Sequence, residues 1–255
     1  MVLDLHDVWA YYAGRCALEG VSMHLAAGER IAVVGPNGAG KSTLFKVIAG
    51  ILRPTGGTVQ VSGSRSDRHV CIAYIEQQAN TNARFPATVE DVVAMGRVAR
   101  VRYFRYRGRR DRAIVADAME RVAITGLRRR QIGELSGGQR RRMFIARALA
   151  QEAEIMLLDE PYAGLDAEAS YQLTETLDAV GESMAVMVAT HDLAVAEHLG
   201  RVMLLNRRLI AAGAPRDVLA AEHLAAAYGN DVRRIGAGGG NPLDGAAPRQ
   251  SIHAP

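Results

Sequence analysis

The stretch that decides the fold is Gly35-Pro-Asn-Gly-Ala-Gly-Lys-Ser-Thr43, which follows the apolar run Arg30-Ile-Ala-Val-Val34. It fits the pattern G-x-x-x-x-G-K-[ST], and a strand before it and a helix after it are the context that this loop requires. Gly38 and Gly40 allow a tight turn in which successive backbone N–H groups point inward. The positive end of the following helix adds to these groups, so the sequence predicts a cradle for phosphate.

The side chains of this loop have separate predicted tasks. Lys41 can reach the β- and γ-phosphates of a nucleotide, and the Ser42 hydroxyl suits Mg²⁺, which prefers hard oxygen ligands. The predicted nucleotide-binding residues of the loop are Gly35, Asn37, Gly38, Gly40, Lys41, Ser42 and Thr43.

A second apolar run, Ile155–Leu158, ends in the two carboxylates Asp159 and Glu160. Buried carboxylates are costly unless they are paired or bound to a metal, and parallel sheets bind ligands at the ends of their strands. We predict that Asp159 holds Mg²⁺ through its water shell and that Glu160 addresses the water attacking the γ-phosphate. Many strands end in acidic turns, so this pair gains weight only from the phosphate loop; together the two features predict a P-loop NTPase.

The remaining apolar runs predict an α/β protein. Strands and helices alternate, which implies a mostly parallel sheet, and apolar residues at helical spacing over 88–127 predict a helical insertion between two α/β halves. The expected strands are 2–9, 17–25, 30–35, 58–61, 69–75, 155–158 and 184–189, and the expected helices outside the insertion include 41–49 and 167–180. Glycine, proline and alanine dominate 236–255, which predicts a disordered tail.

Composition narrows the class of protein. The 255 residues are 49% hydrophobic and 23% charged, which is ordinary for a globular protein of one large or two small domains. No apolar run reaches the roughly 20 residues that cross a bilayer, and the N-terminus has no pattern of a signal peptide. Two cysteines, Cys16 and Cys71, are too few for a disulfide framework or a zinc cluster and fit a reducing cytosol.

The net charge of +4 comes largely from arginines in 97–112, 128–130 and 140–142. Such basic runs occur at nucleic-acid, lipid and acidic-protein interfaces, but most often they form a solvated face, and that is the interpretation we adopt. The histidines at 198, 223 and 253 are scattered and lack the spacing of metal ligands, so we expect them on the surface.

Leu135-Ser-Gly-Gly-Gln139 introduces a family resemblance, because LSGGQ is the signature of the ABC ATPases and the chain resembles them over nearly its whole length. Further marks follow in the family's order. Tyr12 resembles the aromatic residue that stacks on adenine, with Tyr11 as the alternative, and Gln77 resembles the Q-loop glutamine. Gly164-Leu-Asp166 resembles the D-loop, and His191 resembles the switch histidine.

The resemblance implies a RecA-like core (about 1–78 and 140–229), a small antiparallel β subdomain and an inserted helical subdomain (about 79–139). All of these lie in one ATPase domain over 1–229, and 230–255 forms the tail. It also implies that two copies of the chain sandwich two ATP molecules. Ser136, Gly137, Gly138, Gln139 and Asp166 of one copy would close on the ATP held by the other. His191 would donate to the γ-phosphate, while Gln77 would sense Mg²⁺ and the attacking water.

Phe85–Arg97 resembles the Q-loop exit of bacterial importers for zinc, manganese or iron, which implies an ATPase subunit beneath a separate permease. Zinc or manganese is the expected solute, a ferric-siderophore, haem or cobalamin importer is the alternative, and Glu76 departs from the group's usual proline. A non-transport ABC ATPase is disfavoured, because the chain has neither long coiled coils nor a second cassette.

The expected location is the cytoplasmic face of a bacterial inner membrane. The permease is expected to dock between residues 77 and 97, and an extracytoplasmic solute-binding protein would be an indirect partner. No nucleic acid is expected as a partner. As a hypothesis, the arginines of 97–112 lie near anionic headgroups, each contributing about 1 kcal/mol.

Overall fold

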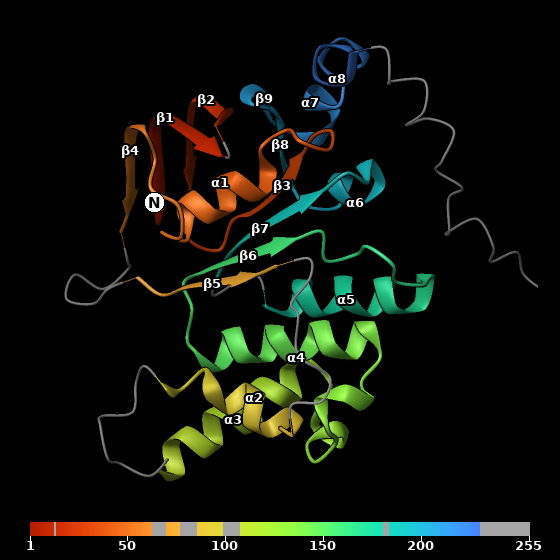
Figure 1. Cartoon of the computed structure of the whole chain (residues 1–255). Coiled ribbons are helices and arrows are strands. Elements are labelled where there is room, and N and C mark those ends of the chain that lie inside the picture. The colour runs from red at the N-terminus through yellow and green to blue at the C-terminus, as the bar shows by residue number, and fades with distance from the viewer. Residues whose placement is uncertain (13, 63–69, 77–85, 99–107, 181–183, 230–255) are drawn as a thin grey trace, which may run out of the picture.

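The structure is a computed structural model and describes residues 1–12, 14–62, 70–76, 86–98, 108–180 and 184–229. Two sheets enclose helix α1, two long helices cover the outer face of the larger sheet, and a smaller group of helices packs beyond them (Figure 1). The layers therefore follow the order small sheet, helix, large sheet, helices. The predicted tail over 230–255 lies outside the described residues.

The small sheet is antiparallel, as the family resemblance implied. It has the strand order β2-β1-β4, and β1 pairs with both neighbours. Its strands are β1 (Leu3–Tyr12), β2 (Arg15–Leu25) and β4 (Gly56–Val61). Apolar residues of β1 and β2 are buried against α1 (Lys41–Ile48), which lies between the two sheets.

The large sheet is parallel except at one edge, which confirms the predicted mostly parallel sheet. Its order is β5-β6-β7-β3-β8-β9, and only β9 runs antiparallel to its neighbour. The strands are β3 (Arg30–Val34), β5 (Ile72–Ile75), β6 (Ile155–Asp159), β7 (Ala185–Thr190), β8 (Arg201–Asn206) and β9 (Arg208–Gly213). The strand expected over 69–75 is shorter than predicted, because described pairing with β6 begins at Ile72.

Side chains on the central strands alternate between two hydrophobic cores, as the period of a strand requires. Ile31 and Val33 of β3 face the core around α1, whereas Ala32 and Val34 face the core on the opposite side of the sheet. That second side is covered by α4 (Gly137–Ala150) and α5 (Ala167–Val180). The shorter helices α6 (Leu193–Glu197), α7 (Pro215–Val218) and α8 (Ala221–Tyr228) lie near the β8 edge.

The predicted helical insertion contains α2 (Val89–Met95) and α3 (Arg109–Arg121), which pack against α4 (Figure 1). Short 3₁₀ helices at Thr125–Leu127 and Ile132–Glu134 connect α3 to α4. Thr88 begins α2 with a capping box: its hydroxyl accepts from Asp91 N, while the Asp91 carboxylate accepts from Thr88 N. The boundary expected near residue 139 falls inside α4, which contacts both α2 and α5.

Arg97 corrects the prediction of a solvated basic arm. Its side chain is only 6% exposed, and its Nε lies 3.0 Å from Asp111 Oδ1. Its Nη1 donates to Ala150 O and to Glu152 Oε2, each at 2.9 Å. Arg97 therefore joins the end of α2, the start of α3 and the end of α4, while residues 99–107 of the predicted arm lie outside the described residues.

Within the described ranges, none of the helices combines the length and the apolar character that a membrane crossing needs.

Candidate functional site

The loop between β3 and α1 approaches its neighbours so closely that glycine is required at two positions. A Cβ atom on Gly35 would lie 2.1 Å from Leu205 O, and one on Gly40 would lie 2.3 Å from Ala17 O. Gly40 also has φ = 97°, in the left-handed region that favours glycine. These contacts hold the loop against β8 and β2, so its backbone is shaped before any ligand arrives.

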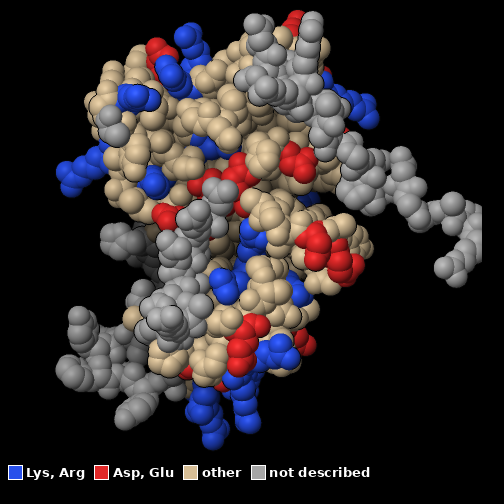
Figure 2. All heavy atoms as spheres, turned by 45° about the vertical axis from the view of Figure 1, so that its right-hand side comes forward, with Lys and Arg blue, Asp and Glu red and all other residues tan. Residues whose placement is uncertain are grey.

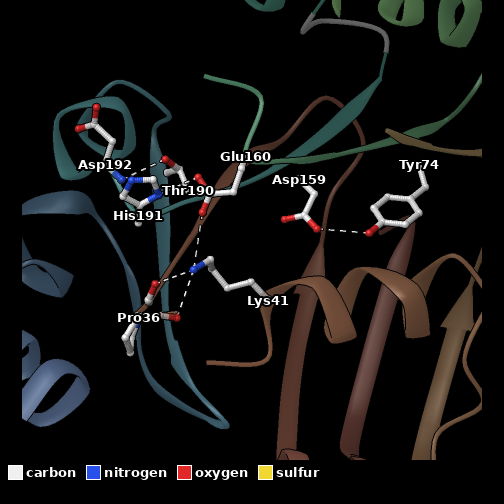
Figure 3. Close-up of polar contacts among 9 residues, drawn as sticks. Pro36, Lys41, Tyr74, Asp159, Glu160, Thr190, His191 and Asp192 are labelled. Carbon is white, nitrogen blue, oxygen red and sulfur yellow. Dashed lines mark hydrogen bonds and ion pairs between the residues drawn. The ribbon is translucent and has the colours of Figure 1, made fainter. Parts of the chain in front are cut away.

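Lys41, the first residue of α1, folds back over this loop (Figure 3). Its ammonium group donates to Gly35 O at 2.6 Å and to Pro36 O at 3.3 Å, and it lies 3.7 Å from Glu160 Oε1. Burial lowers the pKa of Lys41, and the nearby carboxylates of Glu160 and Asp159 act in the opposite direction. The lysine is thus held at the loop by backbone oxygens and by the carboxylate of Glu160, the residue that follows β6.

The β6 strand presents both predicted carboxylates at the same edge of the sheet. Asp159 and Glu160 are 6% and 8% exposed. Glu160 has φ = 48°, a strained value for a residue other than glycine, and its N–H donates to Ala189 O of β7 at 2.9 Å. Its Oε2 lies 2.9 Å from His191 Nδ1, so the structure joins two residues that the sequence places 31 positions apart (Figure 3).

The chain holds His191 in place through its neighbours. Asp192 begins α6, its carboxylate accepts from Ala194 N at 2.9 Å, and its own N–H donates to Thr190 Oγ1 at 3.0 Å. These bonds fix the turn after β7 on which His191 stands. Lys41, Glu160 and His191 therefore form one connected group at the end of β3, β6 and β7.

Asp159 has a partner that the sequence analysis did not identify. Tyr74 of β5 donates from its hydroxyl to Asp159 Oδ2 at 3.3 Å (Figure 3). Burial raises the pKa of Tyr74, and the negative charge of Asp159 adds to the effect, so the phenol stays protonated. Among the described residues no lysine or arginine forms an ion pair with Asp159, so its buried carboxylate suits a divalent cation.

Ser136–Gln139 forms the N-terminus of α4. The Ser136 hydroxyl accepts from Gln139 N at 3.3 Å, and Gln139 Oε1 accepts from Ser136 N at 3.1 Å. Gly137 and Gly138 stand in the first turn, where backbone N–H groups have no intrahelical acceptor. This end of α4 is therefore a second potential anion site.

The signature residues lie beside the D-loop residues and apart from the phosphate loop. A Cβ on Gly138 would lie 3.1 Å from Ala169 Cβ of α5, and Asp166 begins that helix by accepting from Ala169 N at 2.8 Å. Within the described part of the chain, no hydrogen bond or ion pair joins Ser136–Gln139 to Lys41 or Glu160. One chain therefore has two helix starts that could bind anions, and no described hydrogen bond or ion pair connects them.

Arg141 corrects a second part of the solvated-face prediction. It donates from Nη2 to the carbonyl of Ala163 in the turn before the D-loop, and burial lowers its pKa. The bond ties α4 to the segment that follows Glu160. Figure 2 shows other lysines and arginines extending from the lower end of the molecule, with acidic atoms across the middle of this face.

Tyr12, one of the two candidate tyrosines, contacts helix α1, which follows the phosphate loop. The Nζ atom of Lys46, on α1, lies 5.5 Å from the centre of the Tyr12 ring. Both tyrosines are about half exposed, Tyr12 at 56% and Tyr11 at 50%. Gln77 lies outside the described residues, so its predicted role stays a prediction.

The geometry can be set beside known proteins. Residues 18–163 match the ABC transporter family. The chain is 41% identical to the chelated iron transport system membrane protein YfeB of Yersinia pestis, covering 94% of this chain and 82% of that protein. It is 40% identical to the manganese transport system ATP-binding protein MntB of Halalkalibacterium halodurans, covering 89% of this chain and 92% of that protein.

A solved structure leads to the same family. The chain superimposes on a structure described as an inward-facing ABC transporter of metal-chelate type with a TM-score of 0.78, at 29% identity, covering 89% of this chain and 88% of that one. The family match covers more than half of the chain, and it includes the phosphate loop, the signature residues and both carboxylates. The chain therefore belongs to the ABC transporter family and is one of its ATP-hydrolysing cassettes.

Proposed function

We propose that the chain is the ATPase subunit of an importer and acts as a pair of copies that clasp two ATP molecules beneath a separate permease. The observation that carries this proposal is the separation of two groups of residues within one chain. Lys41, Glu160 and His191 form one connected group beside the phosphate loop, whereas Ser136 begins α4 and has no described hydrogen bond or ion pair with that group. In a pair of copies, the start of α4 in one copy can face the phosphate loop of the other.

In this proposal Glu160 orients the water that attacks the γ-phosphate, and His191 donates a hydrogen bond to that phosphate. Phosphoryl transfer needs positioning and charge stabilisation rather than covalent catalysis. Lys41 would exchange the carbonyls of Gly35 and Pro36 for phosphate oxygens, which bear full negative charge. Gln77 is proposed to contact Mg²⁺ and the same water.

Ser42 and Asp159 are the proposed holders of Mg²⁺. Ser42 is exposed in the first turn of α1, and Asp159 is a buried carboxylate whose described partner is a neutral phenol. Mg²⁺ bound there would neutralise phosphate charge. Tyr74 would keep Asp159 oriented toward it.

The other half of each nucleotide site would come from the partner copy. Ser136, Gly137, Gly138 and Gln139 would bind the γ-phosphate through the start of α4, with Asp166 at the same seam. Tyr12 would stack on adenine within its own copy. Removal of the γ-phosphate by hydrolysis then removes the bridge between the two copies.

A divalent metal ion, zinc or manganese, is the proposed solute. Manganese appears in the name of one relative and chelated iron in that of another of nearly equal identity. Iron is therefore the specific competitor, and the metal-chelate type of the solved structure favours a chelate as the second candidate. A non-transport ATPase would leave the likeness to named transport subunits without explanation.

The permease is proposed to dock at the edge of the large sheet. A cavity of about 300 Å³ lies between β5 and α4, and its lining includes Tyr74, Glu76, Phe144, Arg147 and Gln151. Its lining residue Glu76 immediately precedes, in sequence, the predicted docking segment that begins at 77; residues 77–85 lie outside the described ranges. The chain would thus sit at the cytoplasmic face of the inner membrane, with a solute-binding protein on the other side.

The division into one ATPase domain over 1–229, with a helical subdomain over 79–139, is proposed on the same basis. The described helices α2 and α3 form a group that packs mainly on α4, on the side of that helix away from the large sheet.

Two experiments test the proposal, the first on the purified chain and the second in cells. Glu160→Gln should retain ATP binding, lower turnover at least 100-fold and form a stable dimer with Mg²⁺ and ATP. Glu120→Gln, an exposed acid on α3, is the matched control. A monomeric Glu160→Gln protein at saturating ATP would contradict the paired mechanism.

Solute and role are tested by uptake of zinc, manganese and iron in cells carrying the permease, with wild-type chain or Lys41→Ala. Loss of uptake of one metal in the Lys41→Ala cells identifies the solute. Unchanged uptake of all three, with ATPase activity abolished, would refute the metal importer but not the ATPase.

A further inference from the structure

Tyr228 carries a buried hydroxyl that the proposed chemistry does not yet use. It is the last residue of α8, and its ring packs against the core that covers the α4 side of the large sheet. Its Oη is fully buried and has no hydrogen-bond partner among the described residues. Phenylalanine would fill the same space without leaving a buried polar atom unpaired, so the hydroxyl calls for an explanation.

The end of α8 is fixed at the nucleotide edge of the sheet. Asn206, at the end of β8, donates from Nδ2 to Ala227 O at 2.9 Å. The next residue, Arg207, donates from its N–H to Ala39 O of the phosphate loop at 2.8 Å. The end of β8 therefore connects the two elements: Asn206 is bonded to α8 next to Tyr228, and Arg207 is bonded to the phosphate loop.

The buried phenol of Tyr228 holds its proton firmly. Burial, with a further contribution from the negative charge of Glu160, raises the pKa of Tyr228 to about 12. The phenol therefore stays protonated at neutral pH and can donate a hydrogen bond to a carboxylate.

The present partners of Glu160 are groups that ATP would attract. Oε1 lies 3.7 Å from Lys41 Nζ, and Oε2 lies 2.9 Å from His191 Nδ1. If Lys41 and His191 both bind phosphate, as the proposed function requires, Glu160 loses these two partners in the ATP-bound state, in which it must orient the attacking water. A buried donor nearby could then keep it aimed.

We propose that Tyr228 is a positioning residue for hydrolysis, whose hydroxyl donates to Glu160 in the ATP-bound dimer, directly or through one water. This inference rests on the proposed role of Glu160. It assigns to α8 a task in the reaction in addition to its packing.

The test is Tyr228→Phe in the full-length chain, assayed for ATP turnover with Mg²⁺ under conditions in which the wild type is active. We expect kcat to fall about tenfold, equivalent to about 1.4 kcal/mol, with the KM for ATP unchanged within about twofold. Tyr171→Phe, which removes an exposed tyrosine hydroxyl from α5, should leave both constants at the wild-type value.

A double-mutant cycle separates positioning from general structure. If Tyr228 acts through Glu160, Tyr228→Phe should not slow the residual turnover of Glu160→Gln any further. An equal tenfold fall in both backgrounds, or a wild-type kcat for Tyr228→Phe, would overturn the inference. So would a slowed turnover that appears only in Tyr228→Leu, which also removes the ring, because the effect would then come from packing.

The proposed roles of Glu160 and Tyr228 would be refuted by different results. Normal turnover of Glu160→Gln would refute the role of Glu160 itself. Slow turnover of Glu160→Gln combined with a fully active Tyr228→Phe would refute the role of Tyr228 alone.

Discussion

Arg97 allows the sharpest test of the packing described above, because one side chain joins three helices. In Arg97→Ala the Ala150 carbonyl loses a donor, and Asp111 and Glu152 lose their cation. Removing one partner of a fully buried ion pair costs about 3–5 kcal/mol. Glu152 is 45% exposed and can be rehydrated, whereas Asp111 is only 19% exposed, so we expect about 2–4 kcal/mol.

The assay is thermal unfolding of the purified chain at neutral pH. For a protein of this size 1 kcal/mol shifts the melting temperature by about 2–4 °C, so Arg97→Ala should melt roughly 5–15 °C below the wild type. Arg112→Ala removes an exposed arginine from α3 and should change it by less than about 2 °C. An Arg97→Ala protein as stable as the Arg112→Ala control would show that Arg97 is solvated, as its charge pattern had indicated.

Three further predictions concern single sites. Gly40→Ala forces a Cβ to within 2.3 Å of a backbone oxygen at a positive φ, so ATP binding measured by calorimetry should be lost; wild-type affinity would contradict the loop geometry. Tyr74→Phe removes the donor to Asp159 and should change the Mg²⁺ concentration for half-maximal ATPase activity by about 3- to 10-fold. An unchanged Mg²⁺ titration would contradict this role of Tyr74. Glu29 is partly buried, which raises its pKa, but hydrogen bonds from Ala26 and Arg201 outweigh this and hold it below 4.5. A carboxyl group whose pKa is lower in the folded chain stabilises the fold at pH values above its pKa in the unfolded chain. This stabilisation is lost as the pH falls through its pKa in the folded chain. The stability difference between wild type and Glu29→Gln in urea should therefore be largest at pH 7 and shrink as pH falls below 4.5; a difference independent of pH would refute it.

Features that depend on neighbouring residues could be predicted from the sequence. The phosphate loop is continuous with β3 and α1, Asp159 ends β6 and Glu160 directly follows it, so pattern and chain order were enough. The capping box at Thr88 and Asp91 is equally local, because its two residues are three positions apart.

Features that depend on distant residues could not be predicted in this way. Arg97 appeared solvated because its acids lie 14 and 55 positions away, and Arg141 because its acceptor is a backbone carbonyl 22 positions away. Tyr74 meets Asp159 only because β5 pairs with β6, which is a property of the sheet order rather than of either segment.

Helix α4 has a mechanical consequence. Ser136 stands at its first end, and Gln151, which lines the cavity beside β5, follows its last turn. Fourteen helical residues span about 21 Å, and a helix of that length resists bending. If the twin copy binds at the serine end and the permease at the Gln151 end, as proposed, a push at one end would reach the other as a tilt of one rigid helix.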